Sequence, residues 1–269
     1  MKSPEQSLKT SPETTASELS SSCAQNPSYK EKLRELADSY QIELTDEQTE
    51  SLLHHLDLML HKNQVMNLTR ITSVDDALVL HILDSLLLLP SLEYTAPSDK
   101  SSSGAILDIG TGAGFPGIPL ALLTNRPFTL MDSVSKKVRA VDEFTQALDI
   151  SDRVTTTNER AEKFALSHSG AYEFVVARAV ASLPVLLEYA QPFLVSHGRL
   201  VVSKGRLSDE ELESGMKAAK QVGMKLVSRE TLELPYSMGH REILTFEKVC
   251  KPTLKLPRPV GEAKKHPLG

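Results

Sequence analysis

Residues 105–117 read Ala-Ile-Leu-Asp-Ile-Gly-Thr-Gly-Ala-Gly-Phe-Pro-Gly, and this stretch decides the fold. A short apolar run leads the chain into four closely spaced glycines, and a helix is expected over residues 116–123. A strand, a tight turn and a helix start form the first unit of folds that bind nucleotide-like cofactors. Glycine suits such a turn because backbone without a Cβ adopts positive φ and approaches a ligand closely.

Acidic residues stand on both sides of this turn. Asp108 lies just before it, and Asp132 ends the next apolar run, at residues 128–131. An acid about 20 residues beyond the glycines, at the tip of a second strand, is placed to accept hydrogen bonds from ribose hydroxyls. We therefore predict that Asp132 binds the ribose of a cofactor.

The glycine spacing is compatible with two cofactors. From Gly112 it matches the dinucleotide pattern G-x-G-x-x-G, whereas from Gly110 it reads G-x-G-x-G, with Asp108 two residues upstream, which is typical of S-adenosylmethionine sites. A dinucleotide needs helix N–H groups directed at its pyrophosphate. Pro116 has no N–H to offer, and Phe115 would place a ring where the diphosphate should lie. The turn therefore favours S-adenosylmethionine, with a nicotinamide-dependent oxidoreductase as the alternative.

The composition limits the class of protein. The chain of 269 residues is long enough for one α/β domain and a smaller appendage. Its two cysteines, Cys23 and Cys250, lie far apart, which is typical of a reducing compartment. The first residues lack the pattern of a secretory signal, and the most apolar segment, residues 78–89, is too short to cross a bilayer. We expect a cytoplasmic protein that does not contact membranes.

A metal site is not expected. Three histidines lie near one another in the sequence but have no thiol or acidic partners at ligand spacing: His54, His55 and His61.

The chain divides into four parts. Residues 1–27 are rich in Ser, Thr, Glu and Pro and are expected to form a disordered extension. Residues 28–95 are predicted to form a helical cap, and residues 96–104 a polar linker within the next part, residues 96–250. The last part is a basic tail, residues 251–269. Cap helices are expected over residues 29–44, over residues 45–61 with a Thr45–Gln48 capping box, and from Ser73 to just before Pro90.

From residue 105 onward, strands and helices alternate, which predicts an α/β fold with a parallel sheet covered on both faces. A closing hairpin makes this a seven-stranded mixed sheet, as in a Rossmann-like class I S-adenosylmethionine-dependent methyltransferase. Strands are expected at residues 105–109, 128–132, 154–158, 174–177, 199–203, 225–232 and 241–248. Helices are expected to start near Pro116, Ser135, Ala161, Ser182 and Ser208.

The end of the chain is basic although the net charge is -5. A local patch, rather than the total charge, is what binds phosphate. The simpler interpretation of such a run is a solvated, partly disordered tail. From Lys248 onward its basic residues are Lys248, Lys251, Lys255, Arg258, Lys264 and Lys265, against the single acid Glu262.

Six short runs recur in one order in a known family. They are Asn67-Leu68-Thr69, His81-Ile82-Leu83-Asp84-Ser85, residues 110–117, Asp132-Ser133 with Lys136-Lys137, Arg178-Ala179-Val180-Ala181-Ser182, and Lys204-Gly205. With them, residues 33–248 resemble the bacterial small-subunit ribosomal RNA guanine-N7 methyltransferase G family, also called glucose-inhibited division protein B. The resemblance implies methyl transfer from S-adenosylmethionine to N7 of a guanine in 16S rRNA, on the free RNA or the small ribosomal subunit.

The resemblance also implies a cofactor site. In that family the cofactor lies along positions that correspond here to Gly110, Phe115, Ala161-Glu162 and Arg178. With the two residues taken from the glycine turn and the second strand, the predicted cofactor site is Gly110, Gly112, Phe115, Asp132, Ala161, Glu162 and Arg178. This sequence departs from the family at Lys137, where the family has arginine, and so loses a planar fork for phosphate. It departs again at Leu256, where the family often has an aromatic residue.

Basic residues near the same strand ends are candidates for contacts with RNA. Lys204 and Arg241 are predicted to contact phosphates or bases, and Lys136, Lys137 and Arg139 to form a second rim. In the cap, His81 and Asp84 lie three residues apart on one predicted helix face. We expect them to pair and to hold the cap against the glycine turn.

The implied chemistry requires no catalytic side chain. Guanine N7 carries an unprotonated lone pair on the major-groove edge and needs no general base. The enzyme has only to hold this lone pair in line with the methyl–sulfur bond. We therefore assign no catalytic residue and expect a monomer. A non-catalytic ribosome-assembly factor with the same fold remains a further alternative.

Overall fold

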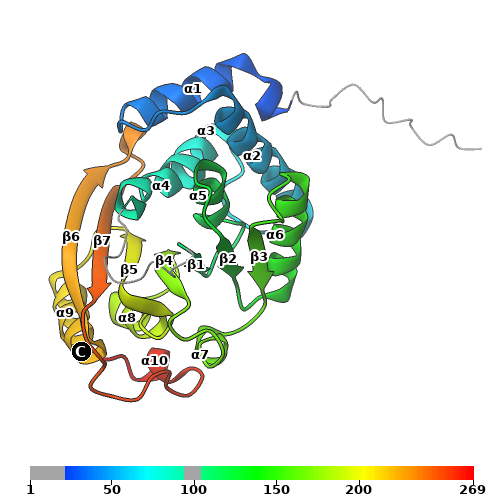
Figure 1. Cartoon of the computed structure of the whole chain (residues 1–269). Helices are drawn as coiled ribbons and strands as arrows, with labels where there is room; N and C mark the ends of the chain where they lie inside the picture. The colour runs from blue at the N-terminus through cyan, green and yellow to red at the C-terminus, as the bar shows by residue number, and fades with distance from the viewer. Residues whose placement is uncertain (1–21, 94–103) are drawn as a thin grey trace, which may run out of the picture.

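The computed structural model describes residues 22–93 and 104–269. One seven-stranded sheet crosses the molecule, and helices cover both of its faces (Figure 1). Most of the predicted N-terminal extension and of the predicted linker lies outside the described residues.

The sheet has the order β3-β2-β1-β4-β5-β7-β6. Strand β7 runs antiparallel to β5 and β6, and the other neighbouring strands are parallel. This confirms the predicted mixed sheet with a closing hairpin. The strand order reverses between β1 and β4, and ligands of open α/β sheets bind at the carboxyl ends of the strands at such a point. The strands are β1 (Ile106–Ile109), β2 (Phe128–Met131), β3 (Val154–Thr157), β4 (Tyr172–Arg178), β5 (Leu194–Lys204), β6 (Met224–Glu233) and β7 (His240–Lys248).

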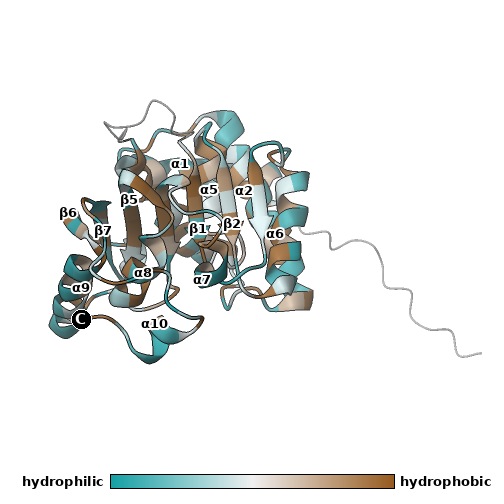
Figure 2. Ribbon diagram, turned by 60° about the horizontal axis from the view of Figure 1, so that its bottom comes forward, coloured by the Kyte–Doolittle hydropathy of each residue, from teal (hydrophilic) through white to brown (hydrophobic). Residues whose placement is uncertain are grey.

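Alternating side chains of the sheet build two hydrophobic cores. In β1, Ile106 joins one core, while Leu107 and Ile109 join the other, because successive side chains of a strand point to opposite faces. Both faces of this strand are buried, as is usual for parallel strands between helical layers. In Figure 2, β5 in the middle of the molecule is mainly in the hydrophobic colour, whereas α9 and α10 at its outside are mainly in the hydrophilic colour.

Each face of the sheet has its own layer of helices. The first layer holds α1 (Pro27–Asp38), α2 (Asp46–Met66), α3 (Val74–Ala77), η2 (Leu78–Leu83), α4 (Asp84–Leu86), η3 (Leu89–Leu92), α5 (Gly117–Leu123) and α6 (Ser135–Ala147). The second holds α7 (Ala161–Phe164), α8 (Leu183–Ala190), α9 (Asp209–Val222) and α10 (Glu262–Lys265). Two short 3₁₀ turns complete the described elements, η1 (Cys23–Gln25) and η4 (Pro235–Ser237).

The predicted cap helices are present with shifted ends. The capping box before α2 is confirmed, because Thr45 Oγ1 accepts from the Gln48 amide at 3.1 Å and Gln48 Oε1 accepts from the Thr45 amide at 3.0 Å. Helix α1 ends at Asp38 rather than residue 44, since Gln41 takes a positive φ of 61° that an α-helix does not contain. The third predicted helix is interrupted by η2, which is a π-helix.

The helices of the cap share one core with the sheet. Leu52 of α2 and Ile82 of η2 belong to the same buried cluster as Ile106 of β1. The preceding turn η1 is fixed by Asp57, whose carboxylate accepts from the Cys23 amide at 2.8 Å. The structure therefore places residues 23–26, which the sequence assigned to a disordered extension, in ordered contact with α2.

The C-terminal tail is folded onto the second helical layer, in contrast to the solvated tail expected from its charge. Arg258 pairs with the buried Glu188 of α8, and the Thr253 hydroxyl donates to the Gln221 carbonyl at 3.0 Å. The ammonium of Lys248 donates to two backbone carbonyls, so it is not exposed for phosphate. Among the described residues, no helix is both long enough and apolar enough to cross a membrane.

Candidate active site

The glycine turn lies at the carboxyl end of β1. At two of its positions a larger residue is excluded, for different steric reasons. At Gly110, with φ 78°, a Cβ would stand 2.6 Å from Val180 Cγ2, so a side chain has no room. At Gly112, with φ 60°, the nearest atom to a Cβ is the Gly110 carbonyl oxygen at 3.9 Å. Gly112 therefore leaves an open space beside the turn that any larger residue would fill.

The amides of the turn donate within the chain. Gly112 N–H donates to Asp132 Oδ2 at 3.1 Å, and Gly117 N–H donates to Asp108 Oδ2 at 2.9 Å. The Gly114 and Phe115 amides both donate to the Thr111 carbonyl at 2.9 Å. Two carboxylates thus hold the turn in shape, and they occupy amides that a pyrophosphate would need.

Asp108 lies fully buried beneath the turn. Its neighbours are the Gly117 amide, which donates to Oδ2, and the buried hydroxyl of Thr111. Burial raises the pKa of the Asp108 carboxyl to about 7, because a charge is unfavourable away from water. Asp132 accepts from two amides, since its Oδ1 also accepts from the Val134 amide at 2.8 Å.

A cleft of about 580 Å³ opens between the glycine turn, the ends of β4, β5 and β7, and the cap. We call it the cap-side hollow. Its polar lining comes mainly from elements that are distant in sequence: Thr69, His81, Asp84, Thr111, Lys137, Arg178, Ser203, Lys204 and Arg241.

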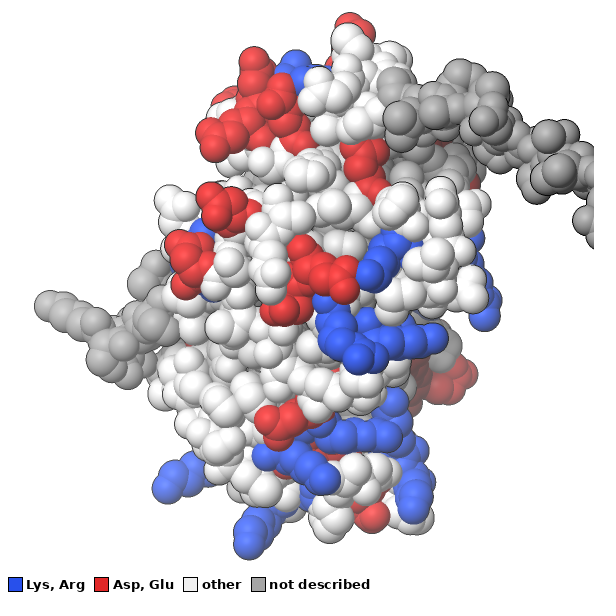
Figure 3. All heavy atoms as spheres, turned by 90° about the vertical axis from the view of Figure 1, so that its right-hand side faces the viewer, with Lys and Arg blue, Asp and Glu red and all other residues white. Residues whose placement is uncertain are grey.

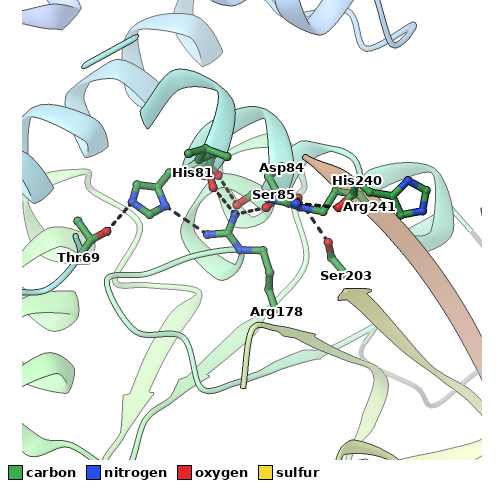
Figure 4. A network of polar contacts seen from close by, with 9 residues as sticks. Thr69, His81, Asp84, Ser85, Arg178, Ser203, His240 and Arg241 are labelled. Carbon is green, nitrogen blue, oxygen red and sulfur yellow. Dashed lines mark hydrogen bonds and ion pairs between the residues drawn. The ribbon is translucent and has the colours of Figure 1, made fainter. Parts of the chain in front are cut away.

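A polar network forms one wall of the cap-side hollow, and Asp84 is its centre (Figure 4). Asp84 Oδ2 accepts from Arg178 Nη1 at 3.0 Å, and Oδ1 accepts from Arg241 Nε at 2.9 Å. The Asp84 residue is only 3% exposed. One buried carboxylate therefore fixes two guanidinium groups, one from the end of β4 and one from the start of β7.

His81 links this network to the glycine turn. Its Nε2 lies 3.0 Å from the Thr69 hydroxyl and its Nδ1 3.4 Å from Arg178 Nη2, while its ring stacks on Phe115 with centroids 4.6 Å apart. Burial and the nearby Arg178 charge lower the pKa of His81 to about 3. The imidazole is neutral at pH 7, with Nδ1 as the acceptor from Arg178.

The expected pair between His81 and Asp84 is not formed. Both residues contact Arg178 instead. The reason is the π-helix η2, whose wider turn changes which residues share a face. His81 still holds the cap against the glycine turn, as expected, but it does so through its stacking on Phe115.

A second cleft, of about 260 Å³, lies between the ends of β2 and β3, α7 and the C-terminal tail. We call it the tail-side hollow. It shares Gly110, Lys137 and Ala179 with the cap-side hollow, so the two clefts meet over β1 and β4. Its remaining lining residues are Ile109, Met131, Asp132, Ser133, Glu159, Arg160, Ala161, Glu162, Val180, Tyr189 and Lys264.

The structure brings all the predicted cofactor residues to these two hollows. Gly110 lines both of them. Gly112, Phe115 and Arg178 line the cap-side hollow, and Asp132, Ala161 and Glu162 line the tail-side hollow.

The predicted RNA contacts fall into two groups. Lys204 is held by the Ala181 carbonyl and by Glu211, each at 2.8 Å, and Arg241 is held by Asp84. Within the described part of the chain, the other three form no ion pair: Lys136, Lys137 and Arg139. On the side of the molecule where α6 lies, Lys and Arg gather on the lower half and Asp and Glu on the upper half (Figure 3).

The sequence did not indicate that Asp84 would pair with both Arg178 and Arg241. It also did not indicate that Tyr189 and Lys264 would line the tail-side hollow. A signal existed for Asp84, because a carboxylate inside an otherwise apolar segment requires a buried partner. No local pattern indicates Tyr189 or Lys264. No group of three metal-ligating side chains occurs among residues 22–93 and 104–269.

Comparisons with known proteins give likenesses in sequence and in fold. A family model described as rRNA small subunit methyltransferase G matches residues 48–238. A ribosomal RNA small subunit methyltransferase G of Alkaliphilus metalliredigens is 37% identical over 228 residues, covering 84% of this chain and 92% of that protein. Its counterpart in Deinococcus radiodurans is 38% identical over 250 residues, covering 91% and 95%.

A solved structure of a Corynebacterium glutamicum protein shares the fold, with a TM-score of 0.50 and 15% identity over 82% of this chain and 97% of that one. At this identity the likeness concerns the fold alone. The family match and the identity to the relatives, both spanning most of the chain, show that this protein belongs to the rRNA small subunit methyltransferase G family.

Proposed function

We propose that this protein transfers a methyl group from S-adenosylmethionine to N7 of a guanine in 16S rRNA. The observation that carries the proposal is the meeting of two hollows at Gly110. The tail-side hollow has carboxylates suited to a nucleoside. The cap-side hollow holds Arg178, a predicted cofactor residue, beside Arg241, which is predicted to contact RNA. Family membership adds the class of reaction and the class of substrate.

The tail-side hollow fits the nucleoside part of S-adenosylmethionine. Each oxygen of Asp132 accepts one amide and retains capacity to accept a ribose hydroxyl. Glu162, across the hollow, has the acceptors that an adenine amino group requires. Gly112, on the cap-side of the same turn, leaves open the space that a side chain would fill, so the cofactor can extend from one hollow into the other. These acceptors and the open turn support a site for this cofactor.

The same turn argues against a dinucleotide. The Gly117 amide at the start of α5 is occupied by Asp108, and Pro116 before it has no N–H. Asp108, partly ionised at pH 7, would repel a diphosphate at this point. A nicotinamide-dependent oxidoreductase is thus disfavoured by the turn itself.

The residues around the cap-side hollow orient the reactants. When bound, S-adenosylmethionine supplies a methyl group on a positively charged sulfur. Guanine N7 needs no general base, so alignment is the task left to the protein. Both ring nitrogens of His81 are engaged by neighbours, which leaves it a support for Phe115 rather than an acid or base. Arg178 and Arg241 keep fixed positions through Asp84 while they face the hollow.

The basic rim would bind the RNA backbone. Lys136, Lys137 and Arg139 have no ion pair within the described residues and can therefore neutralise phosphates. The proposal includes a cytoplasmic monomer, acting on 16S rRNA or on the small ribosomal subunit.

Calorimetry and mapping of rRNA test the proposal. We expect micromolar binding of S-adenosylmethionine and S-adenosylhomocysteine and no binding of NAD. We also expect one guanine of 16S rRNA to lose its N7 methyl group in cells that lack the protein. Binding of NAD instead would favour the oxidoreductase, and binding of no cofactor with unchanged rRNA would favour the non-catalytic assembly factor.

A further inference from the structure

We infer that the C-terminal segment 256–266 contributes to cofactor binding, because it positions the carboxylate of Glu162. This inference rests on the proposed function and deepens it. The segment lies outside the residues that the family model matches. Its contact with the tail-side hollow joins residues 99 positions apart in the sequence.

The segment is fixed to the second helical layer by a bidentate ion pair. Arg258 donates to both oxygens of Glu188, from Nε at 2.7 Å and from Nη2 at 2.5 Å. The same Nη2 donates to the His266 carbonyl at 2.9 Å, which closes the segment into a loop. Ala263 inside this loop is completely buried. A bidentate pair with a buried carboxylate gives the loop a defined geometry.

The turn at Gly261 delivers the contact to Glu162. The Gly261 amide donates to Glu162 Oε1 at 2.8 Å, with Gly261 at φ 84°. The Tyr189 hydroxyl contacts the same carboxylate, and burial together with the Glu162 charge raises the pKa of Tyr189 to about 12. The phenol therefore stays protonated and can donate. Glu162, which is almost fully buried, is held from two sides.

A fixed carboxylate binds a ligand better than a mobile one. The glutamate side chain loses rotamer freedom when a ligand fixes it, and a prior contact removes this cost. Glu162 lines the tail-side hollow while Gly261 and Tyr189 hold it. The tail therefore acts through Glu162: Gly261 is a positioning residue, and its amide is the group that matters.

A proline substitution tests this amide in the full-length protein. Gly261→Pro removes the N–H, and we expect the Kd for S-adenosylhomocysteine to rise about tenfold in calorimetry, as for loss of one hydrogen bond to a charged group. The KM for S-adenosylmethionine should rise likewise, while kcat and the KM for rRNA stay within about twofold. A change confined to kcat or to the KM for rRNA would overturn the inference.

Gly170→Pro is the matched control. Gly170 also has a positive φ, of 64°, no heavy atom near its Cβ position, and an amide that donates to a backbone carbonyl at 2.9 Å. It lines neither hollow. Its substitution should therefore leave the Kd for S-adenosylhomocysteine unchanged. Equal losses in both variants would mean that Gly261 acts only on the fold, and would overturn the inference.

If Gly261→Pro fails to fold, amide hydrogen exchange on the unaltered protein tests the same inference. Coupling between two sites is reciprocal, so a contact that favours the ligand must itself be stabilised by the ligand. We expect S-adenosylhomocysteine to slow amide hydrogen exchange at Gly261 and not at Gly170. If S-adenosylhomocysteine binds but does not slow exchange at Gly261, the inference about the tail is overturned and the proposed function is not. No binding of S-adenosylhomocysteine by the unaltered protein overturns the proposed function and this inference with it.

Discussion

The cap-side hollow and the rim of α6 both carry positive charge, but they carry it differently. In the hollow, Arg178 and Arg241 are paired with Asp84. On the rim, Lys136 and Arg139 are exposed and, among the described residues, without an ion pair. A half-buried guanidinium that is paired with a buried carboxylate has little freedom left, whereas an exposed and unpaired basic side chain remains free to contact a phosphate.

This difference separates orientation from affinity. Burying the Asp84 cluster is costly unless each charge is compensated, so the cluster holds one arrangement. The rim contributes to binding through counterion release, which does not require fixed side chains. We therefore expect changes in the hollow to affect stability and geometry, and changes on the rim to affect the salt dependence of RNA binding.

The largest effect is expected from Asp84→Ala. It leaves two guanidinium groups without their common carboxylate, and removing one partner of a buried pair costs about 3–5 kcal/mol. The control is Asp75→Ala, since Asp75 pairs with Lys32 at the surface. That pair should contribute less than about 1 kcal/mol. Urea unfolding measures both, and similar losses would show that Asp84 is no more than a surface charge.

A smaller effect on stability, but a large one on cofactor binding, is expected from Gly112→Val. The branched side chain would fill the open space beside the turn and would be strained at φ 60°. We expect the Kd for S-adenosylhomocysteine to rise more than about 100-fold, or about 2.7 kcal/mol. Gly170→Val carries the same strain away from both hollows. If both variants bind equally well, this turn does not hold the cofactor.

A moderate effect is expected from replacing the unpaired rim. With Lys136, Lys137 and Arg139 changed to Gln, the slope of log affinity for rRNA against log salt should fall by about 2, at about 0.7 per phosphate contact on single strands. Because Lys137 also lines both hollows, the methylation rate at saturating RNA is measured on the double variant of Lys136 and Arg139 alone. These two side chains line neither hollow, so that rate should not change.

A second triple variant is the control for the rim. It replaces three basic residues that line neither hollow: Lys217, Lys220 and Lys225. Both triple variants lower the net charge equally. If the slope of log affinity against log salt falls by the same amount in both variants, the effect is due to total charge and the rim is not a specific RNA contact.

The smallest effect on the hollows is expected from Asp108→Asn, which keeps an acceptor for the Gly117 amide. Because the folded-state pKa of about 7 is above the ordinary value of 3.8, the stabilisation by Asp108 is complete below pH 3.8. It is lost as the pH rises to about 7, where the buried carboxyl ionises. Between pH 5 and pH 8, the unfolding free energy should fall less in the variant than in the unaltered protein. A fall of the same size in both proteins would exclude Asp108 as the cause.

Much of the fold could be predicted because its signals are local. Alternation of apolar residues with helix patterns indicated the parallel sheet, and the Thr45–Gln48 box marked the start of α2. The glycine turn at the end of β1 was expected from Gly110 and Gly112, which need positive φ. These features depend on neighbours within a few positions, so the sequence carries them directly.

Other features arise between distant residues, and no local pattern gives the identity of the partners. Asp84 meets Arg178 and Arg241 across 94 and 157 positions. The π-helix η2 changed the partners of His81 and Asp84, although the sequence there reads as an ordinary helix. The basic tail, which by charge alone looks solvated, folds because Glu188 provides a buried partner for Arg258.

The sequence by itself determined the order of strands and helices, the cofactor turn and the chemical types of the site residues. Only the tertiary structure decided which of the positive charges are already paired and which side chains the tail holds in place. The physical reason is that helix and strand patterns are set by local periodicity, whereas ion pairs in the interior are set by how the layers pack around each buried charge.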